Sequence, residues 1–331
     1  MPPRLSAARL IAGTIAIVLL LVAFGGGGVA AQEYPTHQVR VIVPFLPGAG
    51  TDLTGRLAAQ ELTRRLGQSF YVENKAGAGS QIGIDLVAKS RPDGYTLLWT
   101  ASDGISVLPA VKQGLPYRVP EDFAFIARLI ELPYVVVVNP SVPAKTLSEL
   151  IAYAKAHPGQ LRYGTSGIGT ATHMGMALLA RAADIEMLHV PYEGVAPSVA
   201  AVVAGNIDLA LAAPSSVKSF ADAGTLRALA TTGPVRHQLF PDVPTLQEAG
   251  LPGVSIVGWY GLMAAAGTPE AILVRLREAI AAALKDPDVV ARMNKLGYAP
   301  AYLGSDAFRD FVVKDLDQWK TVAQAASITL N

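Results

Sequence analysis

Residues 39–66 read VRVIVPFLPGAGTDLTGRLAAQELTRRL, and this stretch decides the fold class. Its first five residues are apolar and β-branched apart from Arg40, and Pro44 follows them, as expected for a buried strand. From Asp52 to Leu66, small and apolar residues recur with the spacing of one helical face. The stretch therefore predicts a strand, a glycine-rich loop and a helix.

The same alternation continues downstream of this stretch. Residues 70–73 predict a second strand, residues 82–88 a second helix and residues 95–99 a third strand. The sequence Arg-Pro-Asp-Gly at 91–94 predicts a turn before the third strand. A β-α-β-α-β order favours a parallel sheet with helices on its faces.

A second region of the same character begins near Tyr134. Residues 134–138 predict a strand, and the sequence Thr-Leu-Ser-Glu at 146–149 predicts a capping box that starts a helix. The mature chain of about 300 residues exceeds one usual compact domain, so two α/β domains are expected. Further strands are predicted at 161–164, 187–190, 207–211 and 226–231, and further helices at 171–182 and 197–204. An extended segment is predicted at 254–263. It is followed by a helix that begins at 268–270 and by a final helix over 306–325.

The first 31 residues have the pattern of a secretory signal peptide. A positive region with Arg4 and Arg9 precedes an apolar run over residues 10–24, and small residues follow at the positions that a signal peptidase reads. The run is shorter than the roughly 20 residues that a membrane-spanning helix needs, although an uncleaved anchor is the alternative. Removal of residues 1–31 would leave an exported chain that begins near Gln32.

The composition argues against several classes of protein. The chain has 27 Lys and Arg and 26 Asp and Glu, so it lacks the basic surplus of a nucleic-acid-binding protein. It has no cysteine, so no disulfide framework is formed. Its five histidines show no paired metal-ligand spacing. No metal or redox cofactor is therefore expected.

Two strand-to-helix loops are the candidate binding elements, one in each half of the chain. They are PFLPGAGTD at residues 44–52 and GTSGIGTATH at residues 164–173. Glycines allow a close approach of the backbone to a ligand, and the N-terminus of the following helix attracts an anion. Because ligands of open α/β sheets bind beyond the carboxyl ends of the strands, the two loops are expected to face each other across a cleft.

Two side chains in these loops have alternative interpretations. Asp52 fits a helix N-cap, and contact with a ligand ammonium or hydroxyl group is the alternative. His173 is either a satisfied polar residue at a helix start or a ligand-binding group.

Enzymatic motifs in the loops are incomplete. The dinucleotide fingerprint is missing its third glycine because Leu53 stands there, and the second loop has no P-loop lysine. Ser166 lacks the spacing of a nucleophile elbow. Since sequence spacing does not exclude a spatially assembled site, a secreted α/β enzyme acting on a small organic acid remains an alternative, as does a ligand-sensing subunit without transport.

Motifs over nearly the whole mature chain resemble the Bug receptors of tripartite tricarboxylate transporters. The motifs are 34–35, 41–52, 72–79, 92–98, 163–167 with Gly169, Thr170 and His173, 190–194, 241–245, 248–250 and 266–269.

The resemblance implies a periplasmic binding protein with a type II-like fold, two α/β domains and a ligand cleft between them. It implies a discontinuous domain 1 over 32–133 plus 255–331 and a domain 2 over 134–254. It also implies a monomeric, non-enzymatic receptor that carries a mono- or dicarboxylate, amino acid or aromatic acid to the membrane subunits of a transporter. The candidate ligand-binding residues are Phe45, Pro47, Gly48, Ala49, Gly50, Thr51, Asp52, Ser102, Ser166, Gly169, Thr170, His173 and Tyr192.

Three departures from the family pattern bear on the ligand. Many relatives have Lys where this chain has Glu193, and relatives often carry Asp or Asn around residues 212–215, which here are small and mostly apolar. Residues 101–105 are also unlike the family pattern. These departures suggest a less polar distal pocket, suited to a monocarboxylate or an aromatic acid.

Overall fold

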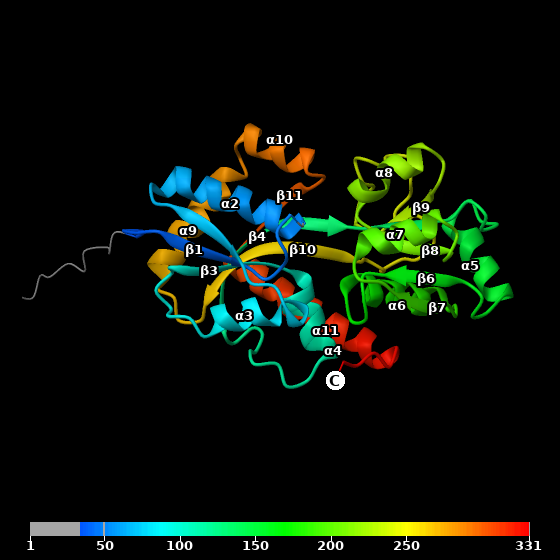
Figure 1. Cartoon of the computed structure of the whole chain (residues 1–331), viewed down its shortest axis with the longest axis horizontal. Coiled ribbons are helices and arrows are strands. Elements are labelled where there is room, and N and C mark those ends of the chain that lie inside the picture. Colours follow the sequence, from blue (N-terminus) through cyan, green and yellow to red (C-terminus); the bar gives the residue numbers. More distant parts are fainter. Residues whose placement is uncertain (1–33, 49, 331) are drawn as a thin grey trace, which may run out of the picture. The chain divides into compact units, whose positions relative to one another are not determined.

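The computed structural model describes residues 34–48 and 50–330. The predicted signal peptide therefore lies outside the described residues, as does Ala49. Residues from His37 onward form one compact unit in which helices and strands alternate (Figure 1). In the part of the chain that the structure describes, no helix has the length and apolar character needed to cross a membrane.

The first sheet has six strands in the order β11-β4-β10-β3-β1-β2. Strand β1 lies between β2 and β3 and is parallel to both, as the β-α-β-α-β pattern predicted, whereas β10 is antiparallel to β3 and β4. Its strands are β1 (Val39–Val43), β2 (Phe70–Asn74), β3 (Thr96–Ala101), β4 (Phe123–Pro133), β10 (Val257–Ala265) and β11 (Ala299–Gly304).

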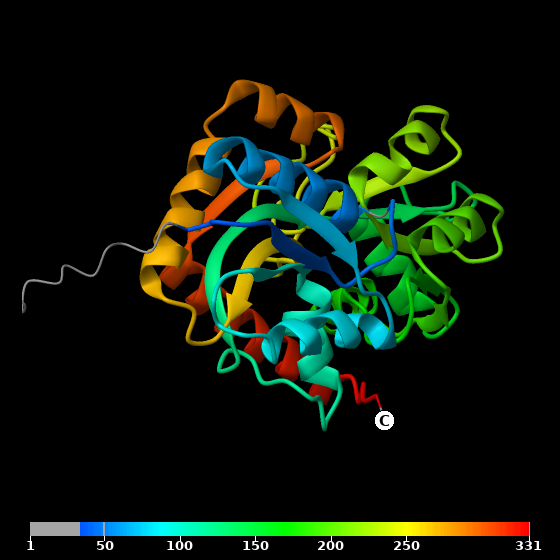
Figure 2. The same ribbon diagram turned by 60° about the vertical axis from the view of Figure 1, so that its left-hand side comes forward.

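Helices cover both faces of the first sheet, and we call this assembly lobe 1. Figures 1 and 2 show α2, α9 and α10 over one face and α3, α4 and α11 over the other. The helical elements are α2 (Gly50–Leu66), the 3₁₀ turn η1 (Ala78–Ser80), α3 (Gln81–Ala88), the π-helical turn η2 (Asp103–Val107), α4 (Leu108–Val111), α9 (Glu270–Ala283), α10 (Pro287–Lys295) and α11 (Ser305–Ala325).

The small residues of α2 allow the helix to pack closely on the sheet. A Cβ atom at Gly55 would lie 2.8 Å from Cδ1 of the buried Trp99 on β3, which is closer than real Cβ atoms come. Ala58, Ala59 and Leu62 are buried on the same helical face. The predicted helical face is therefore the packed one.

The second sheet has five strands in the order β7-β6-β8-β5-β9, and with its helices it forms lobe 2. Here β6 is parallel to β7 and β8, while β5 is antiparallel to β8 and β9. The elements are β5 (Val135–Val138), α5 (Leu147–Ala156), β6 (Arg162–Thr165), α6 (Ala171–Ala183), β7 (Leu188–Pro191), α7 (Val195–Val203), β8 (Leu209–Ala212), α8 (Pro214–Asp222) and β9 (Arg227–Thr231).

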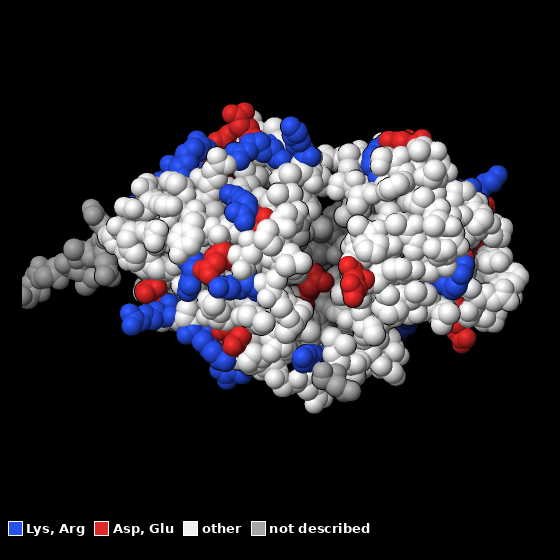
Figure 3. Space-filling model, in the orientation of Figure 1, with Lys and Arg blue, Asp and Glu red and all other residues white. Residues whose placement is uncertain are grey.

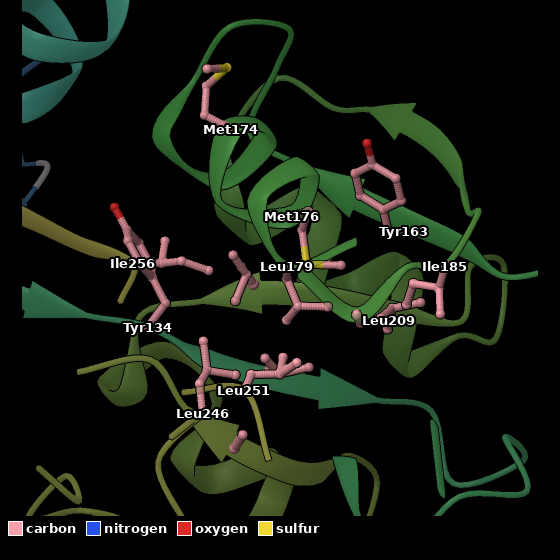
Figure 4. Close-up of a cluster of buried hydrophobic side chains, with 14 of the residues drawn as sticks. Tyr134, Tyr163, Met174, Met176, Leu179, Ile185, Leu209, Leu246, Leu251 and Ile256 are labelled. Carbon is pink, nitrogen blue, oxygen red and sulfur yellow. The ribbon is translucent and has the colours of Figure 1, made fainter. Parts of the chain in front are cut away.

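One buried hydrophobic cluster joins the two lobes. Met174, Met176 and Leu179 of α6 belong to this cluster, and Figure 4 shows that Met176 and Leu179 point towards the lobe 2 strands whereas Met174 points away from them. The same cluster includes α4 residues and the C-terminal part of α11, both from lobe 1. The apolar core is thus continuous between the lobes on the side where α6 meets α11.

The chain passes between the two sheets in two connections, and Thr232 joins them. The first connection runs from β4 to β5 at Tyr134, and the second runs from β9 to β10 through Ile256. The buried Thr232 hydroxyl accepts a hydrogen bond from Tyr134 N at 2.7 Å and donates one to Ile256 O at 2.5 Å. Backbone hydrogen bonds from Thr232 N to Tyr134 O and from Ile256 N to Thr232 O complete the joint. The predicted boundaries of the two domains lie close to these connections and stay a prediction.

Candidate functional site

The first loop leaves the carboxyl end of β1, between the parallel strands β2 and β3. Phe45 is half-buried, whereas Pro47 and Gly48 are exposed. Ala49 lies outside the described residues, and Gly50 is the first residue of α2. The loop therefore lies at the edge of the sheet where a ligand was expected.

Asp52 holds the first loop together from inside the helix. It is the third residue of α2, so its predicted role as N-cap is wrong by position. Its buried carboxylate accepts hydrogen bonds from Gly48 N at 2.9 Å, Arg56 Nε at 3.0 Å and Asn74 Nδ2 at 2.9 Å. Burial raises the pKa of Asp52, but the hydrogen bonds from Arg56, Gly48 and Asn74 outweigh burial and hold that pKa below its ordinary value. Asp52 thus provides the hydrogen-bond acceptor for the backbone N–H of Gly48 in its own loop.

A chain of three hydroxyl groups begins at α2 and reaches into the space between the lobes. The Thr51 hydroxyl is hydrogen-bonded to Tyr260, and the Tyr260 hydroxyl is hydrogen-bonded to Tyr298. A hydroxyl group has one donor and two acceptor positions, so Tyr298 at the end of this chain can form a further hydrogen bond. Burial raises the pKa of both tyrosines, so both are neutral phenols at physiological pH.

Gly50 is required where α2 meets this tyrosine pair. A Cβ atom at Gly50 would lie 2.0 Å from Tyr298 Oη and 3.2 Å from Tyr260 Oη. The tyrosine rings pack edge to face with centroids 5.6 Å apart. Neither tyrosine was predicted as a site residue. Tyr260 was noticed only as part of an extended segment, and the sequence around Tyr298 gave no signal.

A cavity of about 260 Å³ opens between the lobes beside Tyr298. Most of its lining residues are apolar, and they include Ala213 and Pro214, which belong to the predicted distal pocket. Figure 3 shows the surface hollowed between the two lobes. The cavity is lined by residues 131–133 and 297–301 from lobe 1, and by residues 213–215 and 233–238 from lobe 2.

The hydroxyl groups of the second loop bond mainly within that loop. Thr170 is the N-cap of α6, and its hydroxyl accepts from His173 N at 3.4 Å and donates to Gly167 O at 2.8 Å. The Thr172 hydroxyl accepts from Ser166 N at 2.9 Å and also lies 2.9 Å from Ser166 Oγ. These bonds give the loop a fixed shape.

His173 is a neutral, buried residue that faces its own loop. Its Nδ1 accepts a hydrogen bond from Gly169 N at 3.1 Å, which fixes that nitrogen as an acceptor. Its ring stacks on His189 with centroids 3.9 Å apart, and burial, with a smaller effect of His189, lowers the pKa of His173 to about 4. Of the two interpretations of His173, this geometry corresponds to the satisfied polar residue. No group of three or more His, Asp or Glu side chains gathers around a metal position within the described ranges.

Gly169 is covered by the C-terminal segment. A Cβ atom at Gly169 would lie 2.7 Å from Leu330 Cδ1 and 3.2 Å from Val111 Cγ2. Leu330 N donates to Val111 O at 2.7 Å, which holds the segment against α4. The glycine is therefore needed for packing, and its positive φ of 72° also favours glycine.

Tyr192 and Ser102 belong to different lobes. Tyr192 follows β7 and donates from its backbone N to Thr165 O at 3.1 Å, and its neighbour Glu193 is exposed. Ser102 is buried in lobe 1 directly after β3. The next residue, Asp103, accepts a hydrogen bond from Ala171 N at 3.2 Å and so joins lobe 1 to the second loop. Sequence reasoning did not select Asp103, although it noted that residues 101–105 depart from the family pattern.

The sequence of this chain matches a known protein family. A family model described as "Tripartite tricarboxylate transporter family receptor" matches residues 54–328. Protein BugT of Bordetella pertussis is 33% identical over 323 residues, covering 96% of this chain and 98% of BugT.

Two solved structures from Rhodopseudomonas palustris are similar in both sequence and fold. Rpa4515 with adipate is 30% identical with a TM-score of 0.79, covering 89% of this chain and 99% of that one. MatC (Rpa3494) with bound malate is 32% identical with a TM-score of 0.73, covering 87% of this chain and 99% of that one. Similarity of this extent over almost the full length of both chains supports the two-lobed, type II-like binding-protein fold.

Proposed function

Because this chain belongs to the tripartite tricarboxylate transporter receptor family, whose members are solute-binding proteins and not enzymes, we propose that it captures a small carboxylate for uptake. The family is periplasmic, and we propose that residues 1–31 are the cleaved signal peptide that directs export. The captured ligand then passes to the membrane subunits of a tripartite transporter.

The proposed binding site lies between two domains, residues 32–133 with 255–331 and residues 134–254. Its polar end includes the first loop with Gly50 and Thr51, and the hydroxyl of Tyr298. We also include in the proposed site four predicted residues from outside the first loop, namely Ser102, Ser166, Thr170 and Tyr192. Phe45, Pro47, Gly48 and Ala49 complete the first-loop rim, while Asp52, Gly169 and His173 shape the loops.

The observation that carries this proposal is the inter-lobe cavity lined by Tyr298. A hydrogen bond to a charged carboxylate is worth roughly 1.5–3 kcal/mol, and micromolar affinity needs about 8 kcal/mol net. A few such bonds, with apolar burial in the cavity, therefore suffice without an arginine clamp.

The ligand class follows from the same cavity. The solved relatives are described with adipate and with malate, so short-chain acids are the first candidates here. The apolar lining from Ala213 and Pro214 favours a ligand with an apolar body, such as a monocarboxylate or an aromatic acid.

The test is ligand-dependent thermal unfolding of the mature protein that begins at Gln32. The panel holds mono-, di- and tricarboxylates, amino acids and aromatic acids. A ligand at 100 times its dissociation constant stabilises the native state by about 2.7 kcal/mol, so at least one acid should give a saturable rise in the unfolding temperature. Recovery of that acid unchanged is expected of a receptor.

The matched variants are Tyr298→Phe and Tyr302→Phe. Tyr298→Phe removes the proposed donor and should weaken binding of the best acid about tenfold, because a hydrogen bond to a charged group is lost. Tyr302 lies on β11, the strand that follows Tyr298, and is 40% exposed, so its variant should bind as the wild type does. The absence of a shift with every acid, in protein shown by mass spectrometry to carry no ligand, would refute the carboxylate receptor.

A further inference from the structure

Asp103 belongs to lobe 1, and its carboxylate contacts the N-terminus of helix α6 in lobe 2. It opens the π-helical turn η2 directly after β3. Its Oδ1 accepts the 3.2 Å hydrogen bond from Ala171 N, the first residue of the 13-residue helix α6. The helix N-terminus that was expected to attract a ligand anion is therefore already in contact with an anion of the protein.

No cation compensates Asp103 within the described part of the chain. Its hydrogen-bond donors there are the backbone N–H groups of Ala171 and of Asp103 itself. The side chain remains partly accessible to solvent, although protein atoms surround it closely. Burial raises the pKa of the Asp103 carboxyl, and the two backbone donors only partly oppose this effect. Asp103 is therefore a carboxylate without a compensating cation, in the described part of the chain, at the junction of the two lobes.

The tyrosine near Asp103 is a neutral phenol. Tyr134 interacts electrostatically with both Asp103 and Tyr298. Burial raises the pKa of Tyr134 and Tyr298, so both remain phenols. Tyr298 lines the inter-lobe cavity, and Tyr134 lies close enough to interact with both Tyr298 and Asp103.

The turn that carries Asp103 is held in place by packing and by a buried hydrogen bond. The Tyr117 hydroxyl donates to Gly104 O at 2.7 Å. A Cβ atom at Gly104 would lie 2.2 Å from Ile84 Cδ1 and 2.4 Å from Ser80 Oγ. The turn therefore leaves Asp103 little freedom to move.

We infer that Asp103 determines the specificity of the cleft, favouring a small carboxylate that also carries a protonated amine over one that carries a second carboxylate. This inference rests on the proposed receptor function. An ammonium group would form a charge-assisted hydrogen bond with Asp103 and supply the missing positive charge. A second carboxylate would instead place two like charges together in a poorly solvated space, which disfavours binding.

The experiment uses three probes that share one carboxylate and a four-carbon chain and differ at the far end. Pentanoate ends in a methyl group, 5-aminopentanoate in an ammonium group and adipate in a second carboxylate. Titration calorimetry on the mature wild-type protein should show 5-aminopentanoate binding at least tenfold more tightly than adipate. Asp103→Asn keeps the shape of the side chain and removes its charge, so the ratio of the two affinities should fall about tenfold.

Asp310→Asn is the matched control, because Asp310 is an exposed carboxylate of lobe 1 on α11. It should leave the affinity ratio unchanged. Asp103→Ser is a second neutral variant, and thermal unfolding of each variant verifies that it folds.

The outcomes separate this inference from the proposed function. Wild-type protein that binds adipate as tightly as 5-aminopentanoate, or that does not bind 5-aminopentanoate, contradicts the role of Asp103. An affinity ratio that is the same in wild type, Asp103→Asn and Asp103→Ser does so too. In each of these cases, binding of any acid in the wider panel still supports the receptor function. The receptor function itself is contradicted only if no acid in the panel binds.

Discussion

Gly50 is the residue where the first loop, α2 and the tyrosine pair meet. We expect Gly50→Ala to destabilise the protein by about 1–3 kcal/mol, because its Cβ atom would overlap the Tyr298 hydroxyl. Urea denaturation measures this loss. In the double variant with Tyr298→Phe, the closest contact is removed, so part of the stability should return.

Gly304→Ala is the control for this substitution. Gly304 has a negative φ, and a Cβ atom there would meet its nearest neighbour at an ordinary 3.5 Å. Its variant should change stability by well under about 1 kcal/mol. Full additivity of the Gly50 and Tyr298 substitutions would show that the two residues do not interact.

His173 gives the protein a pH dependence below neutrality. Its pKa is about 4 in the folded protein and about 6.5 in an unfolded chain. Between these values the unfolded state binds a proton that the native state does not, so stability falls as the pH falls from about 6.5 towards 4. The expected loss is on the order of 2 kcal/mol.

His173→Asn is the variant that tests this dependence. Asparagine does not titrate and keeps an acceptor near the position of Nδ1, which receives the Gly169 N–H. Free energies of unfolding at pH 7 and pH 5 should therefore differ less in this variant than in the wild type. Asp103 and His189, whose pKa values also differ from their ordinary values, are present in both proteins. An unchanged difference would mean that His173 is not the residue responsible.

At the scale of the element, the capping box of α5 is a prediction that the structure confirms in part. The Thr146 hydroxyl accepts from Glu149 N at 3.1 Å, as predicted. The Glu149 carboxylate, however, accepts from Lys145 N at 2.6 Å, one residue before the expected partner. We expect Thr146→Ala to cost about 1 kcal/mol in urea denaturation. Ser148→Ala, at an exposed position in the first turn, should cost much less, and equal losses would contradict the cap.

Elements with a simple period were predictable from sequence, and irregular ones were not. The predicted strands and helices of lobe 2 match β5 to β9 and α5 to α7 within about two residues, because short apolar runs alternate with capped helices. Strand β4 was missed. It pairs with β10 through two register shifts and carries the buried Arg128, which lies over the Phe311 ring at 4.6 Å.

Some missed elements had a readable signal. Helix α10 begins with Asp286 as N-cap and a proline in its first turn, and the Asp286 side chain accepts from Asp288 N at 3.1 Å. This is a common helix start. The tyrosine part of the candidate site had no such signal, because Tyr298 meets Gly50 only through contacts distant in the sequence.

At the scale of the whole molecule, the two connections between the lobes depend on one hydroxyl group. Thr232 is fully buried and satisfies both Tyr134 N and Ile256 O. Thr232→Val keeps the size of the side chain but leaves a buried donor and a buried acceptor without this partner. We expect a loss of about 1–3 kcal/mol for each group that stays unsatisfied, measured by urea denaturation.

Thr232→Ser distinguishes the hydroxyl group from the methyl group of the same residue. Serine keeps both hydrogen bonds and loses only the methyl contact, so it should retain most of the wild-type stability. The two variants should also differ in ligand-induced stabilisation, because a receptor that binds between its lobes relies on connections that hold the two loops in register. Equal losses in Thr232→Val and Thr232→Ser would place the stabilisation in methyl packing, and the joint between the connections would then rest on its backbone hydrogen bonds alone.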